Sequence, residues 1–370
     1  MARLDDICAI NMGQSPDSAS YNENGEGMPF FQGNADFGKI HPKVRVWCSA
    51  PTKIAHAGDV LISVRAPIGA LNIADRECCI GRGLAALTVN EGLCVKDYLW
   101  YAIASKVDEL NSKGTGSTFK AISKGVLAET EIPLPDLNEQ KKVAEQLTKV
   151  DGLIAARKEQ LAKLDQLVKS RFIELFGAIN DDVPLSYYIA SLNAGKSLAG
   201  EEECPNKVLK TGAATYDYFD ATQVKNLPLD YEPQEDHRVS AGDVIISRMN
   251  TAELVGAAAY VWDVPERVYL PDRLWRAEIK DTANAIFVWQ VLIQSSTKES
   301  IRRIASGTSG SMKNISKLGL LGIRVVKAPI SLQEQFAAFV EQTDKSKLAI
   351  QQSLDKLETL KKSLMQEYFG

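Results

Sequence analysis

The chain has 370 residues, enough for two domains of ordinary size, and its 45% hydrophobic and 24% charged residues are typical of a globular protein. No apolar run approaches the roughly 20 residues that cross a bilayer, and the opening MARLDDICAI lacks a signal peptide's apolar core. We therefore expect a cytoplasmic protein without a membrane partner. The net charge of −4 argues mildly against nucleic-acid binding, although such binding depends on where the charges lie.

The cysteines and histidines indicate neither a metal site nor a disulfide framework. No two cysteines form a C-x-x-C pair, and only three histidines could assist them. We expect reduced thiols that are mostly packed inside the protein. The residues concerned are Cys8, Cys48, Cys78, Cys79, Cys94 and Cys204, with His41, His56 and His237.

The most informative feature is an internal repeat, because the chain ends twice in a similar way. RFIELFG closes a first copy at Gly177, and MQEYFG closes a second at Gly370, 193 residues later. Earlier segments recur in the same order. They are ICAINMGQS (7–15) with IASLNAGKS (189–197), AGDVLISVR (57–65) with AGDVIISRM (241–249), GTGSTFKAISK (114–124) with GTSGSMKNISK (307–317), and NEQKKVAEQL (138–147) with QEQFAAFVEQ (333–342).

Each copy starts with a globular segment, predicted at residues 1–135 and 178–329. A turn rich in Gly, Ser and Asn leads into short β-type stretches such as DVLISVR and DVIISRM. Amphipathic helices are predicted next, at residues 95–114 and 285–307, each ending at a glycine. The expected fold class is α+β, with two α/β domains of mixed and antiparallel β-structure.

Each copy finishes with a long helical region, predicted at residues 136–177 and 330–370. Residues 139–176 contain no proline, and Leu147, Ile154, Leu161, Val168 and Leu175 recur every seven positions. Polar positions of one helix match apolar positions of the other, so the two can share one apolar seam. The pattern favours an antiparallel intramolecular coiled coil in a pseudo-two-fold repeat. The alternative is that each amphipathic helix packs separately on its own domain.

The glycine-rich turns are candidates for binding phosphate. Such a turn exposes backbone N–H groups, hydroxyls and a lysine, and the one in the second copy lies inside a locally basic stretch, residues 298–327. A single turn of this kind usually only connects two elements, but this one recurs at the same place in both copies. The candidates are Ser117, Thr118, Lys120, Ser311, Lys313 and Asn314.

Candidate base-reading residues are polar side chains able to form paired hydrogen bonds, Arg toward guanine and Asn or Gln toward adenine. Any one of them could instead be a surface residue or a structural ion-pair partner. The first copy offers Gln32, Asn34, Arg65 and Arg82, and the second offers Arg248, Asn250, Arg273 and Arg276.

The order of these parts resembles the specificity subunit of type I restriction-modification systems. The most specific pieces are GQSPDS (13–18), GDVLISVRAPIGALNIA (58–74), CIGRGLAAL (79–87) and IPLPDLNEQKKVAEQL (132–147). The second copy departs from them, with RVVKAPISLQEQ and SRMNTAELVGAA at the corresponding places. The resemblance implies two target recognition domains, at 1–135 and 178–329, alternating with two conserved helical regions.

The resemblance also implies a function and partners. Each recognition domain would read one half of a split, asymmetric site in double-stranded DNA, and the helix pair would set the unread gap. Two modification subunits carrying S-adenosylmethionine, and restriction subunits using ATP and Mg, would assemble with the chain. The chain itself would hold no cofactor and catalyse nothing.

Other interpretations stay open at this point. NAGKS (193–197) ends like a P-loop, but Ala190 stands where that motif needs a glycine. NLPL (226–229) is the nearest approach to the tetrapeptide of an adenine methyltransferase and lacks its paired prolines and aromatic residue. The remaining alternatives are a specificity module of a methylation-only or other phage-defence complex, and a coiled-coil scaffold that binds no DNA.

Overall fold

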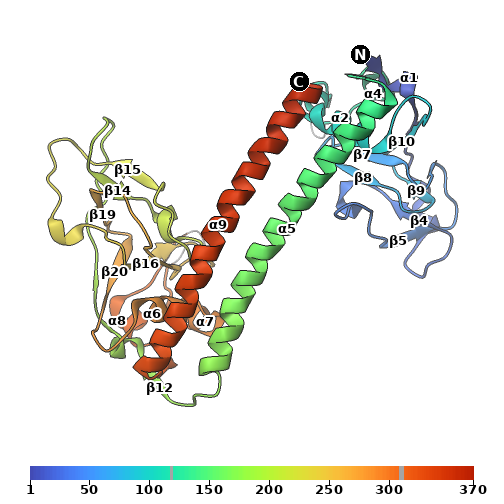
Figure 1. Ribbon diagram of the computed structural model, residues 1–370. Helices are drawn as coiled ribbons and strands as arrows, with labels where there is room; N and C mark the ends of the chain where they lie inside the picture. Colours follow the sequence, from blue (N-terminus) through green and yellow to red (C-terminus); the bar gives the residue numbers. More distant parts are fainter. Residues whose placement is uncertain (117–119, 308–311) are drawn as a thin grey trace. The chain divides into compact units, whose positions relative to one another are not determined.

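The computed structural model describes residues 1–116, 120–307 and 312–370, and it divides into two compact units. Unit 1 is Met1–Glu159 with Ile350–Gly370, and unit 2 is Gln160–Ala349. Each unit therefore contains one globular segment, the start of the long helix that follows it and the end of the other long helix (Figure 1).

Unit 1 is built on two sheets. The first is fully antiparallel, in the order β2-β10-β7-β8, with β2 (Cys8–Met12), β10 (Leu84–Val89), β7 (Val60–Ser63) and β8 (Leu71–Ile73). The second is mixed, in the order β3-β5-β4-β9-β6, with β3 (Tyr21–Asn22), β5 (Val46–Cys48), β4 (Met28–Phe31), β9 (Cys78–Ile80) and β6 (Ile54–Ala55). A two-stranded antiparallel sheet and short α-helices accompany these sheets. They are β1 (Ala2–Arg3), β11 (Glu131–Ile132), α1 (Leu4–Ile7), α2 (Lys96–Ser105), α3 (Val107–Ser112) and α4 (Lys124–Ala128).

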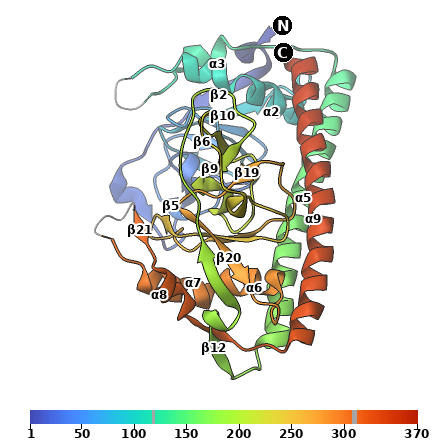
Figure 2. The same ribbon diagram turned by 90° about the vertical axis from the view of Figure 1, so that its left-hand side faces the viewer.

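Unit 2 repeats this plan. Its antiparallel sheet has the order β13-β20-β16-β18, with β13 (Ile189–Asn193), β20 (Leu274–Ile279), β16 (Val244–Ser247) and β18 (Ala258–Tyr260). Its mixed sheet is shorter, β15 (Val224–Asn226), β14 (Lys207–Leu209) and β19 (Val268–Tyr269). The other elements are β12 (Asp182–Pro184), β17 (Met249–Asn250), β21 (Lys313–Asn314), β22 (Arg324–Val326), α6 (Ala285–Leu292), α7 (Ser295–Ile304) and α8 (Lys317–Leu321), several of which Figure 2 labels.

The two units share one plan, so the internal repeat is confirmed. The four-stranded sheets have the same topology, and a parallel pair occurs at the same place in each mixed sheet, β4 with β9 and β14 with β19. Even the short helices α4 and α8 start 193 residues apart, each capped by a serine. The Ser123 hydroxyl accepts the Val126 N–H, and the Ser316 hydroxyl accepts the Gly319 N–H.

The amphipathic helices predicted at 95–114 and 285–307 are each broken into two shorter helices, so that prediction was wrong in detail. In unit 2 the break follows from burial. Every residue of α6 from Ile286 to Leu292 is buried, whereas α7 buries only Thr297 and Ile301. Burial thus changes at the break, where the chain turns at Gln294, whose backbone is extended.

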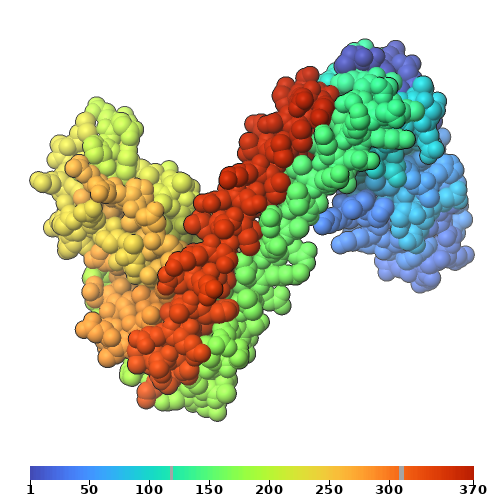
Figure 3. Space-filling view, viewed as in Figure 1, coloured from blue at the N-terminus to red at the C-terminus, as the bar shows by residue number. Residues whose placement is uncertain are grey.

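The two long helices are α5 (Leu137–Phe176) and α9 (Ile330–Phe369), and they pack together as an antiparallel pair. In unit 1, Lys361 lies 2.7 Å from Asp151 and Lys158 lies 2.8 Å from Glu358. Residue numbers thus rise along one helix as they fall along the other. Figure 3 shows the segments of α9 (red) and α5 (green) in contact within each unit. The predicted coiled coil is confirmed, and the alternative of two separately packed helices was wrong.

Lysines that interrupt the apolar seam of α9 meet carboxylates on α5. Lys361 pairs with Asp151 in unit 1, and Lys347 pairs with Asp165 in unit 2. Ile154 and Leu354 lie between these two ion pairs and are buried, and so is Val168, which follows Asp165 on α5. Long lysine side chains therefore cover the edges of the seam while their charges are matched across it.

A buried glutamine fastens the start of each long helix to its globular segment. Gln140 on α5 accepts the Val95 N–H at 2.8 Å and donates to the carbonyl of Leu93 at 3.0 Å. Gln333 on α9, 193 residues later, accepts the Asn284 N–H at 3.0 Å and donates to the carbonyl of Ala328 at 2.8 Å. These are the final glutamine of the NEQ triplet and the first glutamine of the QEQ triplet that mark the repeat.

The six cysteines are buried and free, as expected. Burial raises the pKa of Cys8 and Cys78 to about 12 and the pKa of Cys94 to about 11. Among residues 1–116, 120–307 and 312–370, no group of three His, Cys, Asp or Glu side chains is placed to hold a metal ion. No helix in the same ranges is long and apolar enough to span a membrane.

Candidate nucleic-acid interface

In unit 1, backbone hydrogen bonds connect the loops that carry most of the predicted site residues. Gly83 N–H donates to the carbonyl of Gln32 at 3.2 Å, and Val64 N–H donates to the carbonyl of Gly83 at 2.9 Å. Ala66 N–H then donates to the carbonyl of Lys120 at 3.0 Å. The fold therefore places Gln32, Arg82, Arg65 and Lys120 on consecutive connected loops, and all four side chains are exposed.

The turn that carries Gln32 and Asn34 is held by a buried carboxylate. Asp36 accepts the Gln32 N–H at 2.7 Å and the Gly33 N–H at 3.3 Å, and it pairs with Arg45. Because these interactions hold the backbone, the exposed Gln32 side chain is presented from a rigid turn. Asn34 is half-buried at the start of the short helix η2 (Asn34–Asp36).

Unit 2 builds the corresponding surface from two short strands. β17 pairs with β21, so that Asn250 lies opposite Lys313 and Met249 lies opposite Asn314. In unit 1 the same contact is a single bridge between Arg65 and Ala121. The glycine-rich turn and the end of the central strand, predicted separately, are therefore adjacent in both units.

The hydrogen bonds at this junction are also equivalent. Ile122 N–H donates to the carbonyl of Val64 at 2.9 Å, and Ile315 N–H donates to the carbonyl of Arg248 at 3.1 Å. The backbone plan is thus shared, while the side chain at the strand end is valine in one copy and arginine in the other. A shared frame whose side chains differ between the two copies is suited to recognising two different ligands.

Arg248 and Asn314 each bury a polar atom that has no hydrogen-bond partner among the described residues: Nε of Arg248 and Oδ1 of Asn314. The Arg248 guanidinium carbon lies 5.6 Å from the centroid of the Trp275 ring, and Nη1 is 3.5 Å from the carbonyl of Asp272. Native proteins rarely leave such groups unsatisfied.

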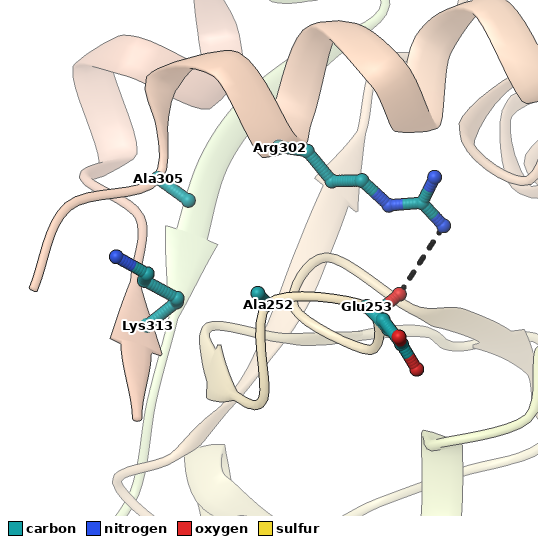
Figure 4. A pocket seen from close by; sticks show the side chains of 5 residues that line it. All are labelled: Ala252, Glu253, Arg302, Ala305 and Lys313. Atoms are coloured by element: carbon teal, nitrogen blue, oxygen red, sulfur yellow. Dashed lines mark hydrogen bonds between the residues drawn. The ribbon is translucent and has the colours of Figure 1, made fainter. Parts of the chain in front are cut away.

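A shallow open pocket of about 400 Å³ lies beside this junction, and Figure 4 shows its lining residues. Arg302, at the end of α7, donates to the carbonyl of Glu253 at 3.3 Å. Lys313 Nζ donates to the carbonyl of Gly307 at 2.6 Å, so this lysine also holds its own turn. The lining residues are Ala252, Glu253, Arg302, Ala305 and Lys313.

Arg276, another predicted base-reading residue, makes several contacts within its own domain. Its guanidinium donates to the carbonyls of Arg238 at 2.8 Å and Asp236 at 2.7 Å, and it lies 3.8 Å from Asp243. Burial raises the pKa of the Asp243 carboxyl. Arg273, by contrast, is exposed, and its carbonyl accepts the Arg248 N–H at 3.1 Å.

The glycine of NAGKS serves close packing, unlike the glycines of a P-loop. A Cβ on Gly195 would lie 2.0 Å from the carbonyl oxygen of Leu270, and a Cβ on Gly13 of NMGQS would lie 2.2 Å from that of Gly81. Ser197 then bonds to Asp272. Both motifs therefore let the chain pass tightly beneath the loops that carry Arg82 and Arg273.

The predictions for Ser117, Thr118 and Ser311 concern residues outside the described ranges. The sequence analysis named no candidate residue in one turn of unit 2. The turn after β4 supplied Gln32 and Asn34, but no residue was named in the corresponding turn after β14, residues 210–218. Matching β14 to β4 within the repeat is the signal that could have found it.

Part of the chain is similar in sequence to known proteins. The family described as "Type I restriction modification DNA specificity domain" matches residues 1–166. A Methanocaldococcus jannaschii protein named as the putative type I restriction enzyme MjaX specificity subunit is 42% identical over 160 residues, 43% of this chain and 38% of that protein. The chain resembles type I specificity subunits. The resemblance inferred from the repeat and its motifs is thereby confirmed.

Further type I specificity subunits support the same conclusion. The MjaVIII specificity subunit of M. jannaschii is 24% identical over 291 residues, 72% of this chain and 68% of that protein. The S subunit of a type I restriction-modification system from M. genitalium has a solved structure with a TM-score of 0.65 and 17% identity, covering 100% of this chain and 95% of that one. The latter likeness shows the fold. This chain spans less than two fifths of the first curated relatives, 38% and 29% of their lengths.

Proposed function

We propose that this chain is the DNA-specificity subunit of a type I restriction-modification complex. Each globular domain reads one half of a bipartite, asymmetric site in double-stranded DNA. The observation that carries the proposal is the junction built twice on one backbone plan, with the exposed Arg65 at the strand end of unit 1 and the half-buried Met249 and Asn250 at that of unit 2. A common frame with different side chains is what reading two different half-sites requires, because base choice depends on the groups presented to the groove.

In this proposal Gln32, Asn34, Arg65 and Arg82 contact bases of one half-site, and Arg248, Asn250 and Arg273 contact bases of the other. Ser117, Thr118, Lys120, Ser311, Lys313 and Asn314 contact phosphates or neighbouring base edges through the glycine-rich turns. Phosphate contacts fix register while base contacts supply specificity. The hydrogen bonds of Arg276 favour a supporting role for that residue.

The two long helices set the length of the unread gap and dock two modification subunits. A helix rises about 1.5 Å per residue, and DNA repeats about every 34 Å, so a helical rod converts length into both spacing and rotational phase. S-adenosylmethionine is expected on the modification subunits, and ATP and Mg on restriction subunits. The chain contributes recognition and no catalysis, and the setting is the cytoplasm.

The decisive experiment is single-molecule methylation mapping of DNA from cells that carry this chain and its modification subunit. The expected result is methyladenine at a split motif that vanishes when this chain is deleted. Exchanging residues 1–135 for those of another specificity subunit should change one half of the motif only. Methylation unchanged by the deletion would contradict the proposal.

The same experiment, extended by cleavage and binding assays, separates the alternatives. A methylation-only complex gives the split motif but no cleavage of unmodified DNA. A coiled-coil scaffold gives no motif and no DNA binding in any assembly. A specificity subunit instead binds DNA with an affinity that falls steeply as salt rises, because phosphate contacts release counterions.

A further inference from the structure

Two exposed tyrosines stand on the turn of unit 2 that corresponds to the Gln32 turn of unit 1. Tyr216 is 68% exposed and Tyr218 is 56% exposed. Their rings are nearly parallel, with centroids 6.4 Å apart and an angle of 18° between the ring planes. Single exposed apolar residues are common on protein surfaces. Two neighbouring rings that lie nearly parallel form instead a small aromatic surface.

The residue between the tyrosines holds an unusual backbone conformation. Asp217 has φ +64°, in the left-handed region that side chains other than glycine seldom adopt. Its carboxylate pairs with Lys298 on α7 and accepts the Ala258 N–H at 3.3 Å. The conformation is therefore stabilised from two other elements, which hold the backbone from which both rings project.

The aromatic surface is continuous with the junction of β17 and β21. Asn250 Nδ2 donates to the hydroxyl of Thr215, the residue before Tyr216, at 3.4 Å. Asn250 in turn lies opposite Lys313 in the strand pair. Tyr216 thus directly follows a residue bonded to a candidate base reader, and Arg248 lies two positions before Asn250 on the same segment.

Unit 1 has no such pair of tyrosines in its corresponding turn. The turn after β4 continues as Phe37, Gly38, Lys39 and Ile40, whereas the turn after β14 continues as Thr215, Tyr216, Asp217 and Tyr218. In both units the turn follows the strand that pairs in parallel with a neighbour, β4 with β9 and β14 with β19. The tyrosines therefore occupy a reading position of unit 2 that differs chemically from its counterpart.

We propose that Tyr216 and Tyr218 contact the bases of the half-site read by unit 2, an inference that rests on the proposed function above. Aromatic faces stack on nucleobases, and apolar rings can wedge against a base step. Asp217 and Lys298 are positioning residues for the two rings. Specificity at this half-site then depends on ring contact as well as on hydrogen bonds from Arg248 and Asn250.

The test uses the full chain assembled with its modification subunits. Methylation mapping first defines the split motif, and fluorescence anisotropy then measures the Kd for a duplex carrying it. We expect Y216A/Y218A to weaken binding by a factor of about 5–150 for each base that no longer has a ring against it, from stacking energies of about 1–3 kcal/mol per base. Y216F/Y218F should bind within about twofold of the wild type, because the ring is kept.

The matched control is Tyr187→Ala, which removes a tyrosine that is 44% exposed elsewhere in unit 2, on η3 (Leu185–Tyr187). It should leave the Kd unchanged. A second duplex, with the half-site of unit 2 scrambled, should bind the wild type and Y216A/Y218A equally weakly. Equal unfolding midpoints exclude a folding defect, and if Y216A/Y218A is unstable, the single variants replace it.

Three results would overturn the inference. In the first, Y216A/Y218A binds the intact duplex as tightly as the wild type. In the second, Y216F/Y218F loses as much affinity as the alanine variant. In the third, Y216A/Y218A fails to assemble with the modification subunits, which would assign the rings to protein docking. If the wild-type complex itself recognises no split motif, the proposed function fails, and that result is distinct from all three.

Discussion

The ring of Phe369, the penultimate residue, packs on the ring of Tyr98 in the core of unit 1, with 5.2 Å between the ring centroids. The equivalent contact in unit 2 joins Phe176 to Phe287 at 5.0 Å. Each long helix therefore begins on its own globular segment and ends with a phenylalanine buried in the core of the other copy. The repeated ending of the sequence is explained by this exchange, because each core needs the end of the other copy's helix.

Phe369→Ala should destabilise unit 1. Truncating a buried phenylalanine to alanine costs about 3–5 kcal/mol. Thermal unfolding of the chain should show a transition several degrees lower than that of the wild type. Ile173→Ala, at a position 66% exposed on α5, is the control and should leave the unfolding temperature within about one degree. An unchanged midpoint for Phe369→Ala would contradict the packing described here.

Gln140→Leu should be as damaging as a core truncation although leucine is apolar and of similar size. The substitution removes the buried side chain that bonds the Val95 N–H and the carbonyls of Leu93 and Pro135, and each of these groups that stays shielded from water costs about 1–3 kcal/mol. Chemical denaturation should show a lower midpoint. The neighbouring Lys141→Leu, at an exposed position of α5, serves as the comparison and should change the midpoint little.

Arg276→Ala and Arg273→Ala should separate structural from recognition roles. Arg276 holds two loop carbonyls, so its loss should lower the unfolding midpoint of the chain. Arg273 is exposed, and its loss should leave stability unchanged while weakening DNA binding in the assembled complex. The unfolding midpoint and the Kd for the split motif should be measured for both variants. If Arg273→Ala lowers the midpoint and Arg276→Ala weakens DNA binding without changing stability, the two assignments are reversed.

Asp151→Lys should weaken the pairing of α5 with α9 through repulsion of Lys361 and should also remove the hydrogen bond from the Tyr101 hydroxyl; the double variant D151K/K361D should restore the charge pairing only. The pair is about one-third exposed, so the recovered energy should be small, about 0.2–1 kcal/mol. The denaturation midpoints of the wild type, D151K, K361D and D151K/K361D together form a double-mutant cycle that isolates the interaction of the two charges. No recovery in D151K/K361D would mean that the two charges do not interact in solution.

The buried thiols predict a loss of stability in alkali. The raised pKa of Cys8 and Cys78, about 12, means that the folded chain keeps protons that an unfolded chain releases above pH about 8.5. The stabilising contribution is present below that pH and is lost as pH rises toward 12. Unfolding midpoints measured at pH 8, 9 and 10 should therefore fall. Thiol titration at pH 8 should find little reaction in the native chain and six thiols after denaturation.

Local patterns predicted much of the fold because they depend on neighbours in the chain. The seven-residue recurrence of Leu147, Ile154 and Leu161 is sufficient to predict a long helix, and the recurrence of AGDV followed by apolar residues is sufficient to predict paired central strands. The breaks within the predicted helices at 95–114 and 285–307 were missed. They depend on what covers each turn of helix, which sequence periodicity does not record.

For the candidate site, residue types were predictable but roles were not. Arg248 and Arg276 look alike in the sequence, yet one keeps a buried Nε without a partner among the described residues and the other is occupied by two carbonyls. Tyr216 and Tyr218 were not predicted as site residues, because exposed tyrosines have no sequence signature. Only the match of β14 to β4 shows that they lie on the turn corresponding to the one that carries Gln32 and Asn34.

The sequence by itself determined that the chain is one design written twice, with a globular segment followed by a long helix in each copy. Those features follow from periodicity and repeated motifs, all of which act over a few residues. The tertiary structure alone decided that Phe369 completes the core around Tyr98, that Arg276 serves the fold, and that the tyrosine turn adjoins Asn250. These relationships join residues far apart in the chain, and packing of whole elements brings them together.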